Sequence, residues 1–393
     1  MKGNMAKSRI CYGIWFLLTI LLYLWSDSWT ALFLAAVTVL LAVFSGISVL
    51  LMKHKVDCTF EIRRMTGKKR PIRGVLCMTN RGMIPIPKAG CRLRIENRVT
   101  GEETTQFLYC SLPAAKTERV EWELKSNYCG NIRITVESLQ CFDVFGMFSV
   151  RELPGTKGQA IVLPDIFPTE VVITESNTSN WESVTYSSVK KGDDPSEIFG
   201  IREYMPGDSL KSIHWKLSGK LDELYVKELS LPVENSILVV YETGILGEKP
   251  EKASVRDAMM EAFLSVSQSL IEDGHIHALG WYDQAKERFT CEEVPTEDDL
   301  AAMLGGLLAV RPGENGYSSL HYYLQDYIEN PFAHIIYITA QQPGAELDRL
   351  MQFCTVSVLL CKEKLSEKEQ GAQGTHLVFS PDHMEEALCQ LIV

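Results

Sequence analysis

Residues suited to chemistry gather between positions 192 and 216, a segment that is also rich in turn-forming Gly, Pro and Asp. Its carboxylates, guanidinium, imidazole and ammonium groups could form a polar site or a docking surface for another protein. Oppositely charged side chains this close in sequence also suit an internal brace of ion pairs between two domains, which is the competing interpretation. The residues concerned are Glu197, Arg202, Tyr204, Gly207, Asp208, Lys211, His214, Trp215 and Lys216.

Catalysis by this segment has a definite geometric requirement. A hydrolase centred on residues 197–216 needs Asp208 and His214 within hydrogen-bond reach in one pocket, and the segment offers no nucleophile with a positioned base. The chain also lacks the P-loop, dinucleotide-binding, nucleophile-elbow and zinc-protease motifs. The sequence therefore predicts a non-enzymatic protein without a cofactor, and the hydrolase stays as an alternative.

The elements that follow the segment predict an open, doubly wound α/β domain over residues 236–393. The apolar run 237–240 is typical of a central strand in a parallel sheet, and a helical period follows it over residues 255–270. Strand and helix patterns then alternate, and the last element is expected to be a helix over residues 382–391. Residues 166–235 link this domain to the preceding one.

The preceding residues, 56–165, predict a small immunoglobulin-like β-sandwich. Short runs such as 91–95, 120–124 and 132–136 are strand-like, several alternate apolar with polar residues, and Gly, Pro and Asn separate them. The whole chain is thus expected to be an α+β multidomain protein.

Residues 1–55 predict a transmembrane hairpin with spans at about 10–26 and 29–52. Both stretches lack charge, and the second is long enough to cross the hydrocarbon core of a bilayer. Lys2, Lys7 and Arg9 precede the first span and Lys53 and Lys55 follow the second, so both termini are expected to be cytoplasmic. The 11 cysteines have no C-x-x-C pair, which agrees with reduced thiols in a cytoplasmic compartment.

Charge is distributed unevenly after the hairpin. Residues 53–100 hold 13 Lys and Arg against three acidic residues, whereas residues 101–393 hold 23 Lys and Arg against 46 acidic residues. A basic segment next to the bilayer can contact anionic membrane lipids, although ordinary positive-inside bias explains it equally well. The acidic remainder argues against nucleic acid as a partner.

The segment between residues 192 and 216 resembles the signature of the bacterial family called domain of unknown function 58. Matching order along nearly the whole chain supports the resemblance: two spans, a β-domain, the signature and an α/β domain. The chain departs from the signature at Lys211, Lys220 and Lys227, where arginine is usual, and at His214, where aspartate is usual. The matching residues are Glu197-Ile198, Ile201-Arg202-Glu203-Tyr204, Pro206-Gly207-Asp208, Lys211-Ser212-Ile213-His214-Trp215-Lys216, Lys220, Val226-Lys227-Glu228 and, upstream, Asp143-Val144-Phe145-Gly146-Met147-Phe148.

The resemblance implies that the α/β domain is related to the von Willebrand factor A fold. Metal-binding members of that fold hold Mg²⁺ with a D-x-S-x-S motif after the first strand. Glu242, Gly244 and Leu246 occupy these three positions here, and a later T-D pair is reduced to Thr339-Ala340. One carboxylate without its hydroxyl companions is a poor site for a hard cation, so no metal is expected.

The resemblance also implies partners. The family looks to be linked with MoxR-type AAA+ ATPases and with membrane proteins that carry transglutaminase-like domains. We therefore expect a membrane-anchored cytoplasmic scaffold or adaptor that works in envelope maturation or stress response. The alternative from another class is a Mg²⁺-dependent ligand receptor built on Glu242.

Overall fold

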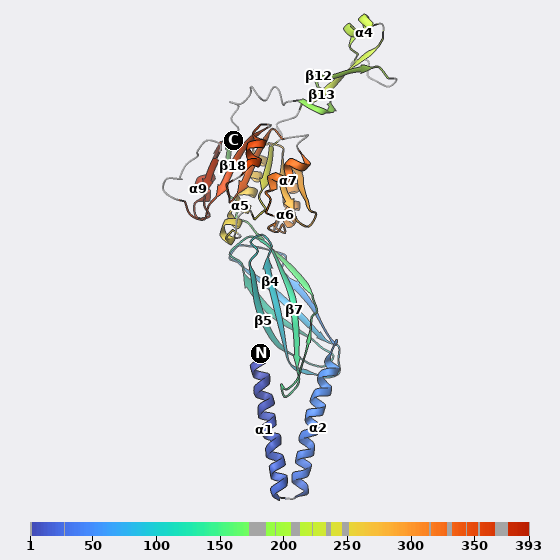
Figure 1. The fold of residues 1–393 in the computed structure, drawn as a ribbon, viewed down its shortest axis with the longest axis vertical. Coiled ribbons are helices and arrows are strands. Elements are labelled where there is room, and N and C mark those ends of the chain that lie inside the picture. The colour runs from blue at the N-terminus through green and yellow to red at the C-terminus, as the bar shows by residue number, and fades with distance from the viewer. Residues whose placement is uncertain are drawn as a thin grey trace. The chain divides into compact units, whose positions relative to one another are not determined.

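The computed structural model describes the chain except for residues 1, 27, 173–185, 193, 206–212, 222, 233–236, 246–250, 314–315, 328–331, 343, 353, 366–375 and 393. The chain divides into two compact units, Met1–Pro164 and Asp165–Val393 (Figure 1). Two apolar helices precede a sheet-rich body of mixed helices and strands, which confirms the general α+β layout.

The first unit begins with two long helices, α1 (Lys2–Ser26) and α2 (Trp29–Met52). The stretches Met5–Ser26 and Trp29–Met52 are long and apolar enough to cross a membrane. Ser28 caps α2, because its Oγ accepts a hydrogen bond from the backbone N–H of Ala31 at 3.3 Å. The turn between the two apolar stretches therefore contains a helix start signal that fixes where α2 begins.

Helices α1 and α2 contact each other. On α2 the buried positions include Ala31, Thr38, Ser45 and Met52. On α1, Tyr12 is half-buried and its hydroxyl donates to the carbonyl oxygen of Thr38. Small and hydroxyl-bearing residues such as Ala31 and Thr38 let two apolar helices approach closely without charged side chains.

Two β-sheets complete the first unit. The smaller sheet has the order β1-β3-β6, and the larger has the order β2-β9-β7-β4-β5 with β8 paired to β7. All neighbours are antiparallel except β2 and β9. The strands are β1 (Val56–Ile62), β2 (Met65–Gly67), β3 (Pro71–Asn80), β4 (Ile86–Asn97), β5 (Glu103–Leu112), β6 (Thr117–Lys125), β7 (Gly130–Phe142), β8 (Ser149–Glu152) and β9 (Lys157–Leu163).

One hydrophobic core lies between these two sheets. Leu76 and Trp122 from the smaller sheet and Leu93 and Ile134 from the larger sheet belong to the same buried cluster. The two sheets therefore pack face to face, with the alternate residues of each strand pointing inward. All 11 cysteines of the chain are free thiols. Burial raises the pKa of Cys91 to about 12, so this thiol is a poor nucleophile.

The second unit is built on a six-stranded sheet with the order β16-β15-β14-β17-β18-β19. Neighbours are parallel except for the edge strand β16, and in chain order the sequence is 3-2-1-4-5-6, as in doubly wound sheets. The strands are β14 (Ile237–Tyr241), β15 (His277–Asp283), β16 (Arg288–Val294), β17 (His334–Thr339), β18 (Thr355–Cys361) and β19 (His376–Phe379).

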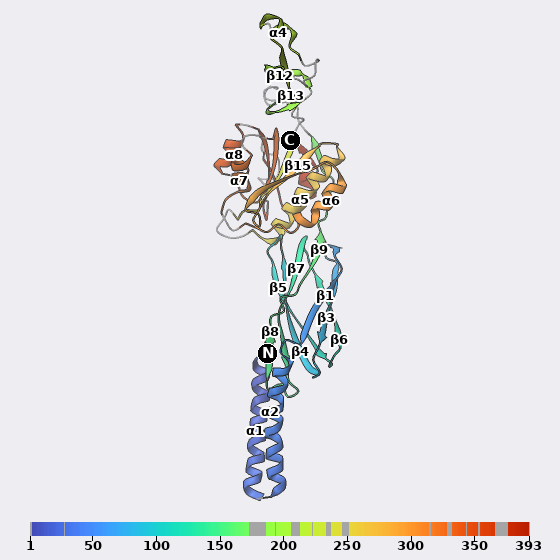
Figure 2. The same cartoon turned by 90° about the vertical axis from the view of Figure 1, so that its right-hand side faces the viewer.

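Helices cover both faces of this sheet, with α5 and α6 on one side and α7 and α8 on the other (Figure 2). Every residue of β14 and β17 is buried, which explains the continuous apolar pattern of β14 and of the central residues of β17. The helices are α5 (Ala253–Glu272), α6 (Glu297–Leu307), α7 (Ser319–Asp326), α8 (Ala345–Leu350) and α9 (Met384–Leu388).

The expected closing helix over residues 382–391 is wrong at its end. Helix α9 stops at Leu388, and β20 (Gln390–Ile392) pairs in parallel with β10 (Glu170–Val172). A tertiary partner therefore overrides the local helical pattern, because β10 offers unpaired backbone groups that a strand can satisfy.

Candidate functional site

The first candidate site lies at the carboxyl end of the central strand β14, where Glu242 follows Tyr241. This edge of the sheet is a switch point, since the chain leaves β14 towards β15 on one side and β17 lies on the other. Glu242 is only 3% exposed. Open α/β sheets commonly bind ligands at this position, so the surroundings of Glu242 decide what the site could do.

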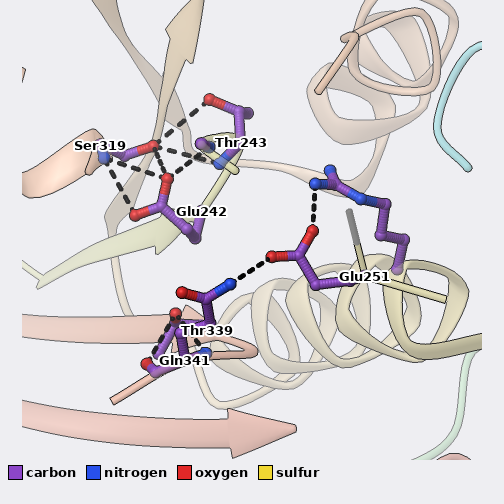
Figure 3. A network of polar contacts seen from close by, with 8 residues as sticks. Glu242, Thr243, Glu251, Ser319, Thr339 and Gln341 are labelled. Atoms are coloured by element: carbon purple, nitrogen blue, oxygen red, sulfur yellow. Dashed lines mark hydrogen bonds and ion pairs between the residues drawn. The ribbon is translucent and has the colours of Figure 1, made fainter. Parts of the chain in front are cut away.

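The carboxylate of Glu242 accepts hydrogen bonds from three separate segments. Figure 3 shows its contacts with Ser319. Its Oε1 accepts from the backbone N–H of Gly244 at 2.6 Å and from Ser319 Oγ at 3.0 Å. Its Oε2 accepts from the backbone N–H of Ser319 at 2.9 Å and from the hydroxyl of Tyr337. These donors tie the end of β14 to the start of α7 and to β17.

Burial and hydrogen bonding act in opposite directions on Glu242. Burial is the larger effect and raises the pKa of its carboxyl group, whereas the donors from Tyr337, Gly244 and Ser319 lower it. The pKa of Tyr337 is raised well above its ordinary value by burial and by the neighbouring Glu242 charge. Both groups therefore hold their protons more tightly than they would in water.

The described residues around Glu242 do not fit a Mg²⁺ site. Hard cations need several oxygen ligands with lone pairs directed at the metal, but both oxygens of Glu242 already accept hydrogen bonds from the protein. Gly244 brings no side-chain oxygen, and Leu246 lies outside the described residues. Within the described part of the chain, no three His, Cys, Asp or Glu side chains form a group that could hold a metal.

A second polar cluster lies close to this edge of the sheet. Glu251 is paired with Arg256, whose side chain is 3% exposed, and it also accepts from Gln341 Nε2 at 3.0 Å (Figure 3). Thr339, at the reduced T-D position, is fully buried and its Oγ1 donates to the carbonyl oxygen of Gln341 at 3.1 Å. Hydrogen bonds within the protein therefore occupy Thr339 too.

The second candidate site is an arm formed by β12 (Asp194–Glu203), α4 (Trp215–Leu221) and β13 (Tyr225–Pro232). Strand β13 also pairs with β11 (Tyr186–Gly192), and β12 and β13 are antiparallel. The backbone N–H of Tyr204 donates to Leu224 O, and that of His214 donates to Tyr225 O, both at 2.8 Å. These bonds hold Tyr204 and His214 next to the start of β13.

The predicted signature residues are only partly placed. Glu197 and Arg202 lie on β12, and the structure describes their backbone alone, whereas Gly207, Asp208 and Lys211 lie outside the described residues. His214 is half-buried, and its Nδ1 accepts from the backbone N–H of Leu217 at 3.2 Å. This ring nitrogen therefore caps the first turn of α4. The hydrolase interpretation requires Asp208 and His214 within hydrogen-bond reach. Because Asp208 lies outside the described residues, the structure gives no distance between these two side chains.

Apolar exposure distinguishes the arm from the Glu242 site. Trp215 is 66% exposed, and Leu224 is 45% exposed. Lys216, next to Trp215, is also exposed. By contrast, Ile213 and Val226, which form a bridge across the arm, are nearly fully buried and supply its internal packing.

Comparison with known families decides what this region is. The family described as "Protein of unknown function DUF58" matches residues 200–327. Residues 200–327 belong to the DUF58 family. The DUF58 match includes the arm from Gly200 onward, Glu242 and its partner Ser319. The DUF58 region therefore includes most of the arm and the residue Glu242, whereas Glu197 of the arm and Tyr337, the third partner of Glu242, lie outside it.

Other comparisons add no functional assignment to the DUF58 region. No protein of curated function matches the chain. The CARDB domain of the PF1109 protein from Pyrococcus furiosus, in complex with di-metal ions, is 14% identical over 27% of this chain and 91% of that domain, with a TM-score of 0.21. The alkylpurine DNA glycosylase AlkC of Pseudomonas fluorescens is 15% identical over 33% of this chain and 38% of its own, with a TM-score of 0.20. At these TM-scores neither similarity supports an argument about this chain.

Two residues of the Glu242 site escaped sequence reasoning. Ser319 was recognisable only as the start of a helix, and Tyr337 only as part of an apolar strand. The available signal for Tyr337 was its phenol hydroxyl in an otherwise apolar central strand, since a buried hydroxyl normally needs a hydrogen-bond partner.

Proposed function

We propose that this protein is a non-enzymatic, membrane-anchored adaptor that docks a partner protein on the arm formed by β12, α4 and β13. The observation that carries the proposal is the exposure of Trp215, at 66%, on that arm. Tryptophan supplies a large apolar surface with few rotatable bonds and is enriched among residues that dominate binding energy at interfaces. An exposed Trp beside an exposed lysine is thus suited to a partner with an apolar pocket and an acidic rim.

The Glu242 site has a structural role in this proposal. Its carboxylate joins β14, α7 and β17, and its oxygens accept hydrogen bonds from groups of the same unit. The sheet order, with an antiparallel third strand, supports a relationship to the von Willebrand factor A fold. A Mg²⁺-dependent receptor is disfavoured by the donors that surround Glu242, so the proposed docking does not depend on a metal.

The partner proposed is a MoxR-type AAA+ ATPase, on the strength of the DUF58 membership and of the association implied by it. A membrane protein with a transglutaminase-like domain is a further proposed partner in the same assembly. Envelope maturation or stress response is the process that such an assembly would serve.

The proposed location is the cell membrane, with both termini in the cytoplasm. Two helices of sufficient length and apolarity support insertion, and the cations at Lys7, Arg9, Lys53 and Lys55 support the orientation. In this arrangement the hairpin holds the arm at the cytoplasmic side of the membrane.

Affinity purification from membranes tests the adaptor proposal. Full-length wild type is compared with Trp215→Ala and with Trp29→Ala, another exposed tryptophan that lies at the start of α2. The proposal expects Trp215→Ala to lose a specific ATPase partner at least tenfold while Trp29→Ala retains it and both variants keep the thermal unfolding midpoint of wild type. Equal recovery of the ATPase with Trp215→Ala, or failure to recover any ATPase with wild type, would contradict it.

A further inference from the structure

A loop of the β-domain lies against both helices of the hairpin. Residues 143–148 connect β7 to β8, and Asp143 at the start of this loop is 2% exposed. The Asp143 carboxylate accepts hydrogen bonds from Ser45 Oγ on α2 and, at 2.9 Å, from the backbone N–H of Phe148. Asp143 therefore stabilises the fold of the loop through Phe148 and attaches the loop to α2 through Ser45.

Helix α1 holds the other side of the same loop. Arg9 Nε donates to the carbonyl oxygen of Met147 at 2.8 Å, and the Arg9 guanidinium carbon lies 6.0 Å from the centre of the Phe148 ring. Tyr12 lies near Phe145, with ring centroids 6.3 Å apart. The 143–148 loop is thus attached to both helices at the ends that carry the flanking cations.

The attachment leaves a groove of about 410 Å³ between α1 and the loop. Its volume lies in the range of small-ligand sites. Lys7 and Ser8 line one end, and the other lining residues are apolar or aromatic. Lys7 and Trp15 are eight residues apart, or about 12 Å along the helix axis. The complete lining is Lys7, Ser8, Cys11, Tyr12, Trp15, Phe145 and Met147.

The order of these residues along α1 follows the polarity profile of a lipid monolayer. Lys7 lies near the start of the apolar stretch Met5–Ser26, where the headgroups of an inserted hairpin would be, and Cys11 and Trp15 lie deeper. A cation at the mouth and an apolar wall below it complement a molecule with an anionic head and a hydrocarbon tail.

We infer that this groove binds one anionic phospholipid, with its phosphate at Lys7 and Ser8 and an acyl chain along Cys11, Trp15 and Phe145. The inference rests on the proposed insertion of the hairpin but not on partner docking at Trp215. A free phosphate would use only the Lys7 end, whereas most of the lining is apolar. The bound lipid would fill the space between α1 and the 143–148 loop and so join the hairpin to the β-domain.

Native mass spectrometry of the full-length protein in detergent tests this inference. The probe is an equimolar mixture of phosphatidylglycerol and phosphatidylcholine with identical acyl chains. Wild type is compared with Lys7→Gln, with Cys11→Phe, which fills the groove without changing charge, and with Lys53→Gln. Lys53 is an exposed cation at the end of α2 that does not line the groove, so it is the matched control.

Wild type is expected to retain one phosphatidylglycerol in preference to phosphatidylcholine. Lys7→Gln should lower that preference about fivefold, the effect of about 1 kcal/mol from one cation. Cys11→Phe should lose both lipids, Lys53→Gln should match wild type, and excess glycerol 3-phosphate should not displace the lipid. Equal effects of Lys7→Gln and Lys53→Gln, full lipid retention by Cys11→Phe, or displacement by glycerol 3-phosphate would overturn the inference. Membrane fractionation and thermal unfolding of each variant separate loss of the lipid from loss of insertion or folding.

Discussion

At the residue scale, Glu242 illustrates how a buried carboxylate can be structural. Its neighbours are donors from the protein itself, and they come from segments that are far apart in sequence: residue 244, residue 319 and residue 337. Removing one donor leaves the carboxyl group equally buried. It takes away one of the hydrogen bonds that offset the free-energy cost of that burial. Glu242 should therefore respond to mutation through stability.

Tyr337→Phe is expected to destabilise the second unit by about 1–3 kcal/mol, because it removes the hydroxyl that donates to Glu242 Oε2. For a unit of this size, each kcal/mol corresponds to a decrease of about 2–4 °C in the unfolding midpoint. Thermal unfolding of the full-length protein measures the effect. Tyr317→Phe is the control, since Tyr317 is 55% exposed, and it should leave the midpoint unchanged. Equal midpoints for both variants would contradict the assigned role of Tyr337.

Acidification should destabilise the second unit through His334. Burial lowers the pKa of His334 from its ordinary 6.5 to about 4, and its Nε2 lies 3.2 Å from Ser357 Oγ. Between pH 6.5 and pH 4 the unfolded chain binds a proton that the folded chain does not, so stability falls as the pH falls. Through this one residue, the free energy of unfolding should fall by about 3 kcal/mol at pH 4.

Urea unfolding of full-length protein between pH 7 and pH 4 checks this expectation. His334→Gln should flatten the dependence of unfolding free energy on pH, whereas His383→Gln, at an exposed position, should not. The comparison between variants is needed because other buried groups also change the stability with pH. Burial lowers the pKa of His277, which also destabilises the folded state as the pH falls. Burial raises the pKa of Glu242, which has the opposite effect on stability. An unchanged pH dependence in His334→Gln would rule out the assignment.

The sequence indicated Glu242 but not its surroundings. The resemblance to the von Willebrand factor A fold singled it out, because Glu242 follows the first strand, where metal-binding members carry their motif. Ser319 and Tyr337 could not be assigned to it, because no spacing rule connects residues 77 and 95 positions away. Such contacts follow from the order of strands in the sheet, which sequence periodicity does not specify.

At the element scale, the sandwich of the first unit depends on close approach between neighbouring strands. Gly74 on β3 lies opposite Trp122 on β6, and a Cβ added at Gly74 would come 2.3 Å from the Trp122 ring. Trp122 is 4% exposed and also contacts Phe60 edge-on, with ring centroids 6.4 Å apart. Gly74 thus provides the space that the indole ring occupies.

Gly74→Ala is expected to lower the free energy of unfolding by about 1–3 kcal/mol, because the added methyl group would clash with the Trp122 ring. A double-mutant cycle with Trp122→Leu identifies the cause. The alanine should cost less than half as much when Trp122 is already replaced by leucine, as followed by thermal unfolding. If Gly74→Ala costs the same in both backgrounds, the contact is not the reason for glycine at this position.

The elements were more predictable than their ends and partners. Alternation and apolar runs identified several strands, among them β4, β6, β7 and β14, because side-chain burial repeats every two residues in a half-buried strand. The predicted strand at residues 237–240 also agrees with β14. The end of α9 did not, because the strand pairing of residues 390–392 with residues 170–172 is a contact between distant parts of the chain. Local propensity contains no information about that contact.

At the scale of the whole molecule, a hairpin with cations at both outer ends is expected to place both chain termini in the cytoplasm. Alkaline phosphatase inserted after Ser28 should therefore be active, and the same enzyme fused after Val393 should be inactive. Green fluorescent protein fused after Val393 should fluoresce. The reverse pattern of activity would contradict the proposed orientation.

The central claim is that Trp215 belongs to a docking surface, and site-specific photocrosslinking tests it most directly. A photoreactive phenylalanine derivative replaces Trp215 or, as a control, Met83, which is 94% exposed in the first unit. The account predicts that irradiation of native membranes joins position 215, but not position 83, to one protein that mass spectrometry identifies as an AAA+ ATPase. Crosslinks from position 215 only to the chain itself, or identical products from both positions, would contradict the claim.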